Sequence, residues 1–153
     1  MKTIASFQIN HDTLTPGMYI SRVDGDVITY DLRMKAPNQG DYLHNAGLHT
    51  IEHLFATYAR NSIWSDQIVY VGPMGCRTGF YFLTRDAMPK EAALELVREA
   101  FRFIYTFQGE IPGGKKAECG NYLDHDPYGA RREAALFLEA LKCWTVEKMA
   151  YPA

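Results

Sequence analysis

Alternation of apolar and polar residues predicts two pairs of β-strands in this chain. The first pair flanks Asp24-Gly25, a dipeptide that suits the positive φ angles of a tight hairpin turn. The second pair is rich in β-branched and aromatic residues and flanks a glycine-rich turn at 72–76. We expect the four strands at about 17–23, 26–34, 67–71 and 79–84.

Apolar residues at helical spacing predict three helices. Leu48, Ile51 and Phe55 form the apolar stripe of the first helix. Pro89 fits the first turn of the second, because proline lacks only an N–H group that would be unpaired there. We expect the helices at about 46–61, 89–108 and 127–149. This order of elements favours an α+β fold, in which a small, mainly antiparallel four-stranded sheet is covered on one face by about three helices.

The composition narrows the class of protein. A chain of 153 residues, 47% of them hydrophobic, suffices for one domain whose core needs no disulfides. The net charge of -2 and the absence of Lys/Arg runs argue against nucleic acid and anionic membranes as partners. No segment approaches the roughly 18 consecutive apolar residues that span a bilayer, and residues 1–10 lack the pattern of a signal peptide. We therefore expect a cytoplasmic protein whose 3 cysteines are reduced.

The pentapeptide from His49 to His53 carries the clearest chemical signal. Residues four apart on a helix lie one above the other, so the two imidazoles can bind one ion. Glu52 borders the same face, which gives the H-x-x-E-H order in which a glutamate transfers protons beside a metal. The alternative interpretation is a surface helix with two titrating histidines. The apolar stripe of the same helix favours the metal interpretation, because buried imidazoles need partners.

A catalytic metal site needs a third protein ligand and an open position. Cys119 is our candidate, because a thiolate binds borderline-soft ions strongly and Gly120 permits a close backbone approach. Glu118 is its competitor. Cys76 lies in the turn between two predicted strands, where an exposed thiol can exchange protons. The competing interpretation of both cysteines is a small buried side chain, and we assign Cys143 to packing on the apolar side of the last helix.

Three motifs together resemble the LuxS family of S-ribosylhomocysteine lyases. They are the pentapeptide 49–53, the stretch Pro73-Met74-Gly75-Cys76-Arg77-Thr78-Gly79-Phe80-Tyr81, and Cys119-Gly120. The resemblance extends over nearly the whole chain, from Ser6-Phe7 and Asn10-His11 through Tyr30-Asp31-Leu32-Arg33 to Gly129-Ala130-Arg131. It implies a single S-ribosylhomocysteine lyase domain over 1–153, with a LuxS/metallohydrolase-like fold.

The resemblance also implies a reaction and a cofactor. LuxS enzymes cleave S-ribosylhomocysteine to L-homocysteine and 4,5-dihydroxy-2,3-pentanedione, the precursor of the quorum-sensing signal autoinducer-2. They do so by metal-assisted aldose–ketose isomerisations followed by a β-elimination. By resemblance, His49, His53 and Cys119 bind the metal, which is one Fe(II) ion per subunit that Zn(II) or Co(II) can replace.

The remaining functional residues follow from the same resemblance. Glu52 and Cys76 match the two proton-transfer residues of the family. We assign the first isomerisation to Cys76, and the later proton transfers and the β-elimination to Glu52. The resemblance further implies a homodimer with two sites at its interface, to which Ser6, His11 and Arg33 contribute substrate contacts from the opposite subunit.

The sequence departs from the family pattern at Tyr70 and Gly72, where many members carry Asp and Ser. We expect the ribose contacts to differ there. Two other functions share part of the pattern. An inverzincin-type peptidase has the same H-x-x-E-H helix, but normally a carboxylate as third ligand and a longer chain. A non-catalytic metal-binding module would have a closed coordination sphere.

Overall fold

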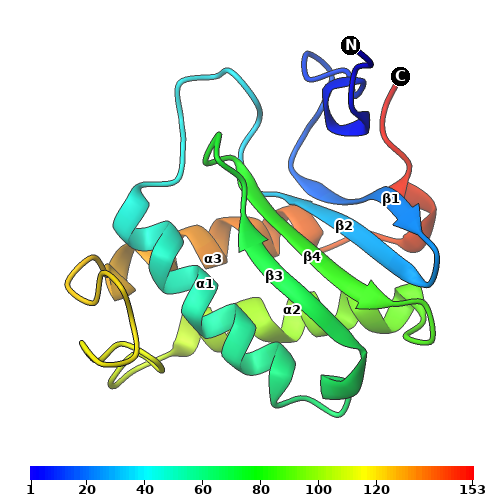
Figure 1. Cartoon of the computed structure of the whole chain (residues 1–153). Coiled ribbons are helices and arrows are strands. Elements are labelled where there is room, and N and C mark those ends of the chain that lie inside the picture. Colours follow the sequence, from blue (N-terminus) through cyan, green and yellow to red (C-terminus); the bar gives the residue numbers. More distant parts are fainter.

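The computed structural model describes residues 1–153 and shows a four-stranded antiparallel sheet with three α-helices against one face (Figure 1). The strands are β1 (Gly17–Asp24), β2 (Val27–Arg33), β3 (Ile68–Pro73) and β4 (Gly79–Arg85), and the helices are α1 (Asn45–Arg60), α2 (Lys90–Thr106) and α3 (Pro127–Leu141). The strand order is β1-β2-β4-β3. The α+β fold and the order of elements are therefore confirmed. None of the helices is long and apolar enough to cross a bilayer.

The hairpin of β1 and β2 forms at the predicted position, but its turn starts one residue later than expected. Asp24 is the last residue of β1 and pairs with Val27, so that Gly25 and Asp26 make the turn. Gly25 has a φ angle of 59°, a left-handed conformation that costs other residues roughly 1–2 kcal/mol. Glycine at this position therefore favours the hairpin over a longer loop.

A chain of aromatic rings connects the sheet to all three helices. Phe82 of β4 contacts Phe55 of α1 with ring centroids 5.3 Å apart, and Phe55 contacts Phe101 of α2 at 5.4 Å. Phe101 in turn meets Phe137 of α3 at 4.9 Å. All four side chains are buried, and large aromatic residues dominate the energetics of a core. Because Phe55 packs inward, the face of α1 that carries the H-x-x-E-H motif stays partly exposed.

The last helix is shorter than expected, because Trp144 turns back towards the sheet. α3 ends at Leu141, and Val146–Met149 form only a 3₁₀ turn. The indole N–H of Trp144 donates to the carbonyl oxygen of Met18 in β1 at 2.7 Å. Arg98 of α2 holds the turn by donating to the carbonyl oxygens of Leu141 and Trp144. These tertiary contacts outweigh the helical preference of the segment.

The early end of α3 corrects the assignment of Cys143. The prediction that Cys143 packs on the apolar side of this helix is wrong, because the residue is exposed. Cys143 lies beyond the last helical residue, so the helical spacing on which the prediction rested does not extend to it. The buried apolar stripe of α3 consists of Ala130, Ala134, Phe137 and Leu141.

We predict that two tyrosines, the buried Tyr30 and the partly buried Tyr151, weaken the fold at high pH. Burial raises the pKa of Tyr30 to about 12, and burial together with Asp31 raises the pKa of Tyr151. In the unfolded chain a tyrosine releases its proton near about pH 10, so the free energy of unfolding falls as the pH rises above that value. Tyrosinate absorbance followed together with circular dichroism should show both residues ionising only as the fold is lost. Ionisation of all 10 tyrosines near about pH 10 in an intact fold would contradict this.

Candidate metal centre

Helix α1 presents His49 and His53 one turn apart, and the loop between α2 and α3 fixes both rings. The Nδ1 atom of His49 lies 2.8 Å from the carbonyl oxygen of Asp124, and that of His53 lies 2.9 Å from the carbonyl oxygen of Pro112. A carbonyl oxygen only accepts, so each Nδ1 carries a proton, and in the neutral imidazole each Nε2 keeps its lone pair. The rings are nearly perpendicular, with centroids 4.6 Å apart. Both imidazoles are thereby prepared to bind a metal through Nε2.

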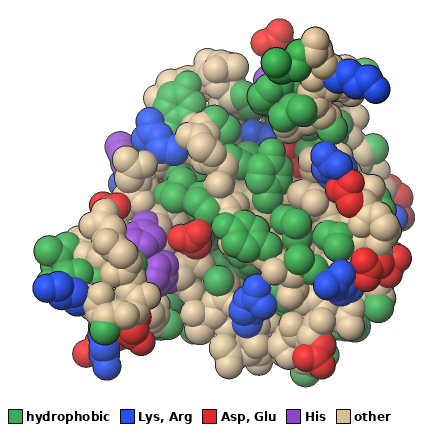
Figure 2. All heavy atoms as spheres, viewed as in Figure 1, with side chains coloured by type: hydrophobic (Ala, Val, Ile, Leu, Met, Phe, Trp, Pro, Cys, Tyr) green, Lys and Arg blue, Asp and Glu red, His purple; other side chains and the backbone are tan.

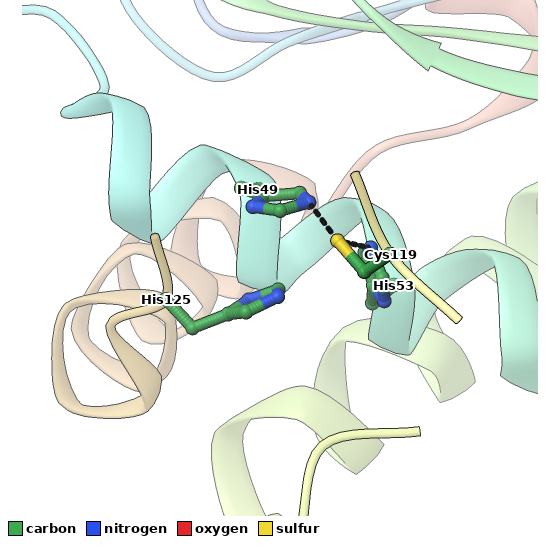
Figure 3. Close-up of side chains that lie close together, drawn as sticks. All are labelled: His49, His53, Cys119 and His125. Carbon is green, nitrogen blue, oxygen red and sulfur yellow. Dashed lines mark hydrogen bonds between the residues drawn. The ribbon is translucent and has the colours of Figure 1, made fainter. Parts of the chain in front are cut away.

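Cys119 completes a set of three donors (Figure 3). Its sulfur lies 3.5 Å from Nε2 of His49 and 3.9 Å from Nε2 of His53. Ligands bonded at about 2.0–2.3 Å in a tetrahedron are separated by roughly 3.5 Å, so the spacing fits one ion. The competing ligand Glu118 is exposed and accepts a hydrogen bond from the N–H of Lys115 instead. Two imidazoles and a thiolate suit Fe(II), Zn(II) and Co(II).

His125 is a fourth member of the cluster that sequence reasoning missed. Its ring stacks on that of His49, with centroids 4.0 Å apart and an angle of 19° between the planes. The donor atoms of His49, His53, Cys119 and His125 all lie within 4.8 Å of one another. Burial, together with His49 and His53, lowers the pKa of His125. A lone histidine in a polar loop shows no spacing signal. The only clue was its place directly before Asp126, the N-cap of α3.

Glu52 borders the metal centre from the side of the sheet. It lines an open pocket of about 330 Å³ together with His53, Arg60 and Tyr70. Its carboxylate makes no hydrogen bond to another protein group, so both oxygens are available to a ligand in the pocket. In the space-filling view, acidic and histidine side chains adjoin an apolar area over the sheet (Figure 2).

Cys76 lies outside the histidine cluster, in the turn between β3 and β4, and is exposed as expected. Its sulfur lies 3.0 Å from the hydroxyl oxygen of Thr78. Arg33 donates to the same hydroxyl oxygen at 2.8 Å, so the hydroxyl proton is free to point at the sulfur. Asp31 accepts two hydrogen bonds from Arg33 and one from the hydroxyl of Tyr151. Burial alone would lower the pKa of the Arg33 guanidinium. The neighbouring carboxylate of Asp31 has the larger effect, so the pKa is raised.

Ser6 and His11 belong to the N-terminal segment, which lies across the sheet from the metal centre (Figure 1). Ser6 lines a second hollow of about 320 Å³ on the face of the sheet that the helices leave free. The Nδ1 atom of His11 lies 2.8 Å from the carbonyl oxygen of Ile9. Within one chain, the structure therefore does not bring these two residues to the metal centre.

Tyr70 and Gly72, the two positions at which we expect the ribose contacts to differ, are in contact with each other. The Tyr70 ring covers the position that a side chain at 72 would occupy, so that a Cβ atom there would collide with it. Tyr70 also lines both the pocket of Glu52 and the hollow of Ser6. A single aromatic ring thus lies between the two cavities.

We predict that Gly113→Ala weakens metal binding. Gly113 has a φ angle of 67°, and a Cβ atom there would lie 3.3 Å from Nδ1 of His53, beside the hydrogen bond that orients this ring. Gly40 is the matched control, because it has a φ angle of 78° but no neighbour within 4 Å. Both alanine variants should lose roughly 1–2 kcal/mol of stability. Only Gly113→Ala should also lose roughly tenfold or more in metal affinity, measured by competition with a chromophoric chelator. Equal affinities of the two variants would contradict this.

Comparisons with known proteins agree with this geometry. The family model described as S-Ribosylhomocysteinase (LuxS) matches residues 4–148. A protein of Phocaeicola vulgatus named S-ribosylhomocysteine lyase is 50% identical, covering 99% of this chain and 98% of its own. Proteins of the same name from Porphyromonas gingivalis and Clostridium acetobutylicum are 48% and 43% identical, with 99% of each chain covered. The chain therefore belongs to the LuxS family.

Proposed function

We propose that this protein, as one domain over 1–153, cleaves S-ribosylhomocysteine to L-homocysteine and 4,5-dihydroxy-2,3-pentanedione. Membership of the LuxS family supports this substrate. The observation on which the proposal rests is the convergence of His49, His53 and Cys119 with tetrahedral spacing, next to a pocket that contains Glu52. The open pocket argues against a closed structural metal site. The thiol donor, where a carboxylate would be usual, argues against a peptidase.

The three donors would hold one divalent ion per subunit, Fe(II) in our proposal, with Zn(II) or Co(II) as substitutes. When bound, such an ion polarises a sugar carbonyl and makes the neighbouring C–H groups more acidic. The fixed Nδ1 hydrogen bonds keep both imidazoles in the tautomer that binds metal.

The free thiols of all three cysteines agree with a reducing cytoplasm, which is the location we propose.

Proton transfer then falls to Glu52 and Cys76. Moving the carbonyl along the ribose requires a base to take a proton from one carbon and return it to the next. We assign the first isomerisation to Cys76. Glu52 serves the later transfers and the final β-elimination, in which a C–H proton leaves, the C–S bond breaks, and the electron pair departs with the homocysteine sulfur. The products together contain all atoms of the substrate, and no step changes the oxidation state of the metal.

We further propose a homodimer that covers the free face of the sheet. Ile4, Phe7 and Tyr70 are each more than half exposed, and apolar side chains gather over the sheet (Figure 2). An exposed apolar area of this kind is typical of an interface. In this arrangement Ser6, His11 and Arg33 act at the metal centre of the partner. Because Thr78 joins Arg33 to Cys76 of the same chain, Cys76 would then act there as well.

We predict metal-dependent release of thiol from S-ribosylhomocysteine, measured with a colorimetric thiol reagent. Removal of the metal by a chelator should abolish it, and added Fe(II) or Co(II) should restore it. Glu52→Gln and Cys76→Ala should each lower turnover by roughly 100-fold or more, because each removes a proton-transfer group. Glu118→Gln is the control and should retain activity, since this carboxylate is exposed and accepts a hydrogen bond from the N–H of Lys115. Full turnover by both Glu52→Gln and Cys76→Ala would refute the assignment of roles.

We predict that two inactive variants restore activity when they are mixed, provided that the two substituted residues belong to the same active site but come from different subunits. Mixed and re-equilibrated His11→Ala and Glu52→Gln subunits should recover about a quarter of native turnover, because half of the dimers are mixed and each has one intact site. Cys76→Ala mixed with Glu52→Gln should behave in the same way if Cys76 accompanies Arg33. His53→Asn with Glu52→Gln is the control without recovery, since both residues belong to one α1. A lack of recovery in the first mixture would exclude the shared site.

A further inference from the structure

The hydrogen bonds around Thr50 fix the state of the His125 ring. The Thr50 hydroxyl donates to the carbonyl oxygen of Ala46 at 3.1 Å, and it accepts from the N–H of Asp126 at 2.9 Å. Its one proton is thereby used, so its contact of 3.0 Å with Nδ1 of His125 requires an N–H on the ring. In the neutral ring, the Nε2 atom of His125 then carries a lone pair, as in the two histidines of α1.

The stacking of His125 on His49 excludes both from binding the same ion in the usual way. An imidazole binds a metal along the lone pair in its own ring plane, at about 2.0–2.1 Å. Two lone pairs in nearly parallel planes point side by side and do not converge on one point. The 19° angle and the 4.0 Å centroid separation describe such a pair, which Figure 3 shows with both rings directed the same way. His49 and His53, at 83°, have no such conflict.

The Nε2 atom of His125 is nevertheless buried, and it has no hydrogen-bond partner in the protein. Leaving a buried acceptor unpaired costs roughly 1–3 kcal/mol, which a ligand that donates a hydrogen bond would offset. We propose that His125 is a substrate-orienting residue and not a fourth metal ligand, and that its Nε2 accepts a hydrogen bond from a ribose hydroxyl bound beside the metal. This inference rests on the proposed lyase function.

Two substitutions separate the two nitrogens of His125. In His125→Asn, the amide nitrogen can replace Nδ1 and keep the contact with Thr50, while the acceptor at Nε2 is lost. In His125→Gln, the amide oxygen reaches the place of Nε2. His44→Asn is the matched control, because His44 is exposed and makes no side-chain hydrogen bond at the N-cap of α1. His53→Asn shows the effect of losing a true ligand.

Each protein is loaded with Co(II), and we measure the metal content, the thiolate-to-cobalt absorption and thiol release from S-ribosylhomocysteine. His125→Asn should keep one ion per chain and an unchanged absorption band, unlike His53→Asn. Its turnover should fall roughly 10- to 100-fold. His125→Gln should recover turnover by at least half of that loss, measured on a logarithmic scale. The turnover of His44→Asn should match that of the unmodified protein.

Three results would overturn the inference. Loss of cobalt or of its absorption band in His125→Asn would make His125 a ligand. Native turnover in His125→Asn, or no recovery in His125→Gln, would show that Nε2 of His125 does not accept a hydrogen bond from the ribose hydroxyl. Failure of the unmodified protein itself to release thiol would instead refute the lyase function, and the identity of the bound hydroxyl with it.

Discussion

The rotation of helix α1 about its axis is the constraint on which the rest of the site depends. A helix turns about 100° per residue, so burying one stripe decides which side every other residue faces. Ile51, Leu54 and Phe55 are buried against the sheet and the other helices, and the aromatic contacts of Phe55 leave this orientation little freedom. A rotation by one residue would carry both histidines away from Cys119. The packing of the core therefore positions the chemistry at the surface.

The loop between α2 and α3 contributes the other half of the site without forming a helix or strand of its own. Backbone groups of Pro112, Asp124 and Asp126 hydrogen-bond to side chains of α1, which orders the loop and at the same time selects the imidazole tautomers. An ion shared by Cys119 and α1 would add a further link across the same gap. Metal binding and loop order would thus be coupled, since each would lower the cost of the other.

Sequence reasoning succeeded where the determinants are local. The spacing of His49 and His53 places them on one helical face, and Gly25 specifies its own turn. Cys119 lies 70 residues beyond His49, so only ligand chemistry and family resemblance indicated it. His125 had neither signal, because a single histidine that meets α1 through the closure of a loop leaves no periodic pattern. The predicted end of α3 was wrong for a related reason. Contacts of Trp144 with β1 and α2 end the helix early, and they too lie far apart in the sequence.

The packing of Tyr70 over Gly72 makes the effect of a change at one of these positions depend on the residue at the other. A side chain introduced at 72 first would displace the aromatic ring from its place between two cavities. A smaller residue at 70 would leave the space open and tolerate later growth at 72. A first substitution at 72 therefore moves the tip of the Tyr70 side chain, which is 54% exposed, whereas a first substitution at 70 leaves position 72 free to change.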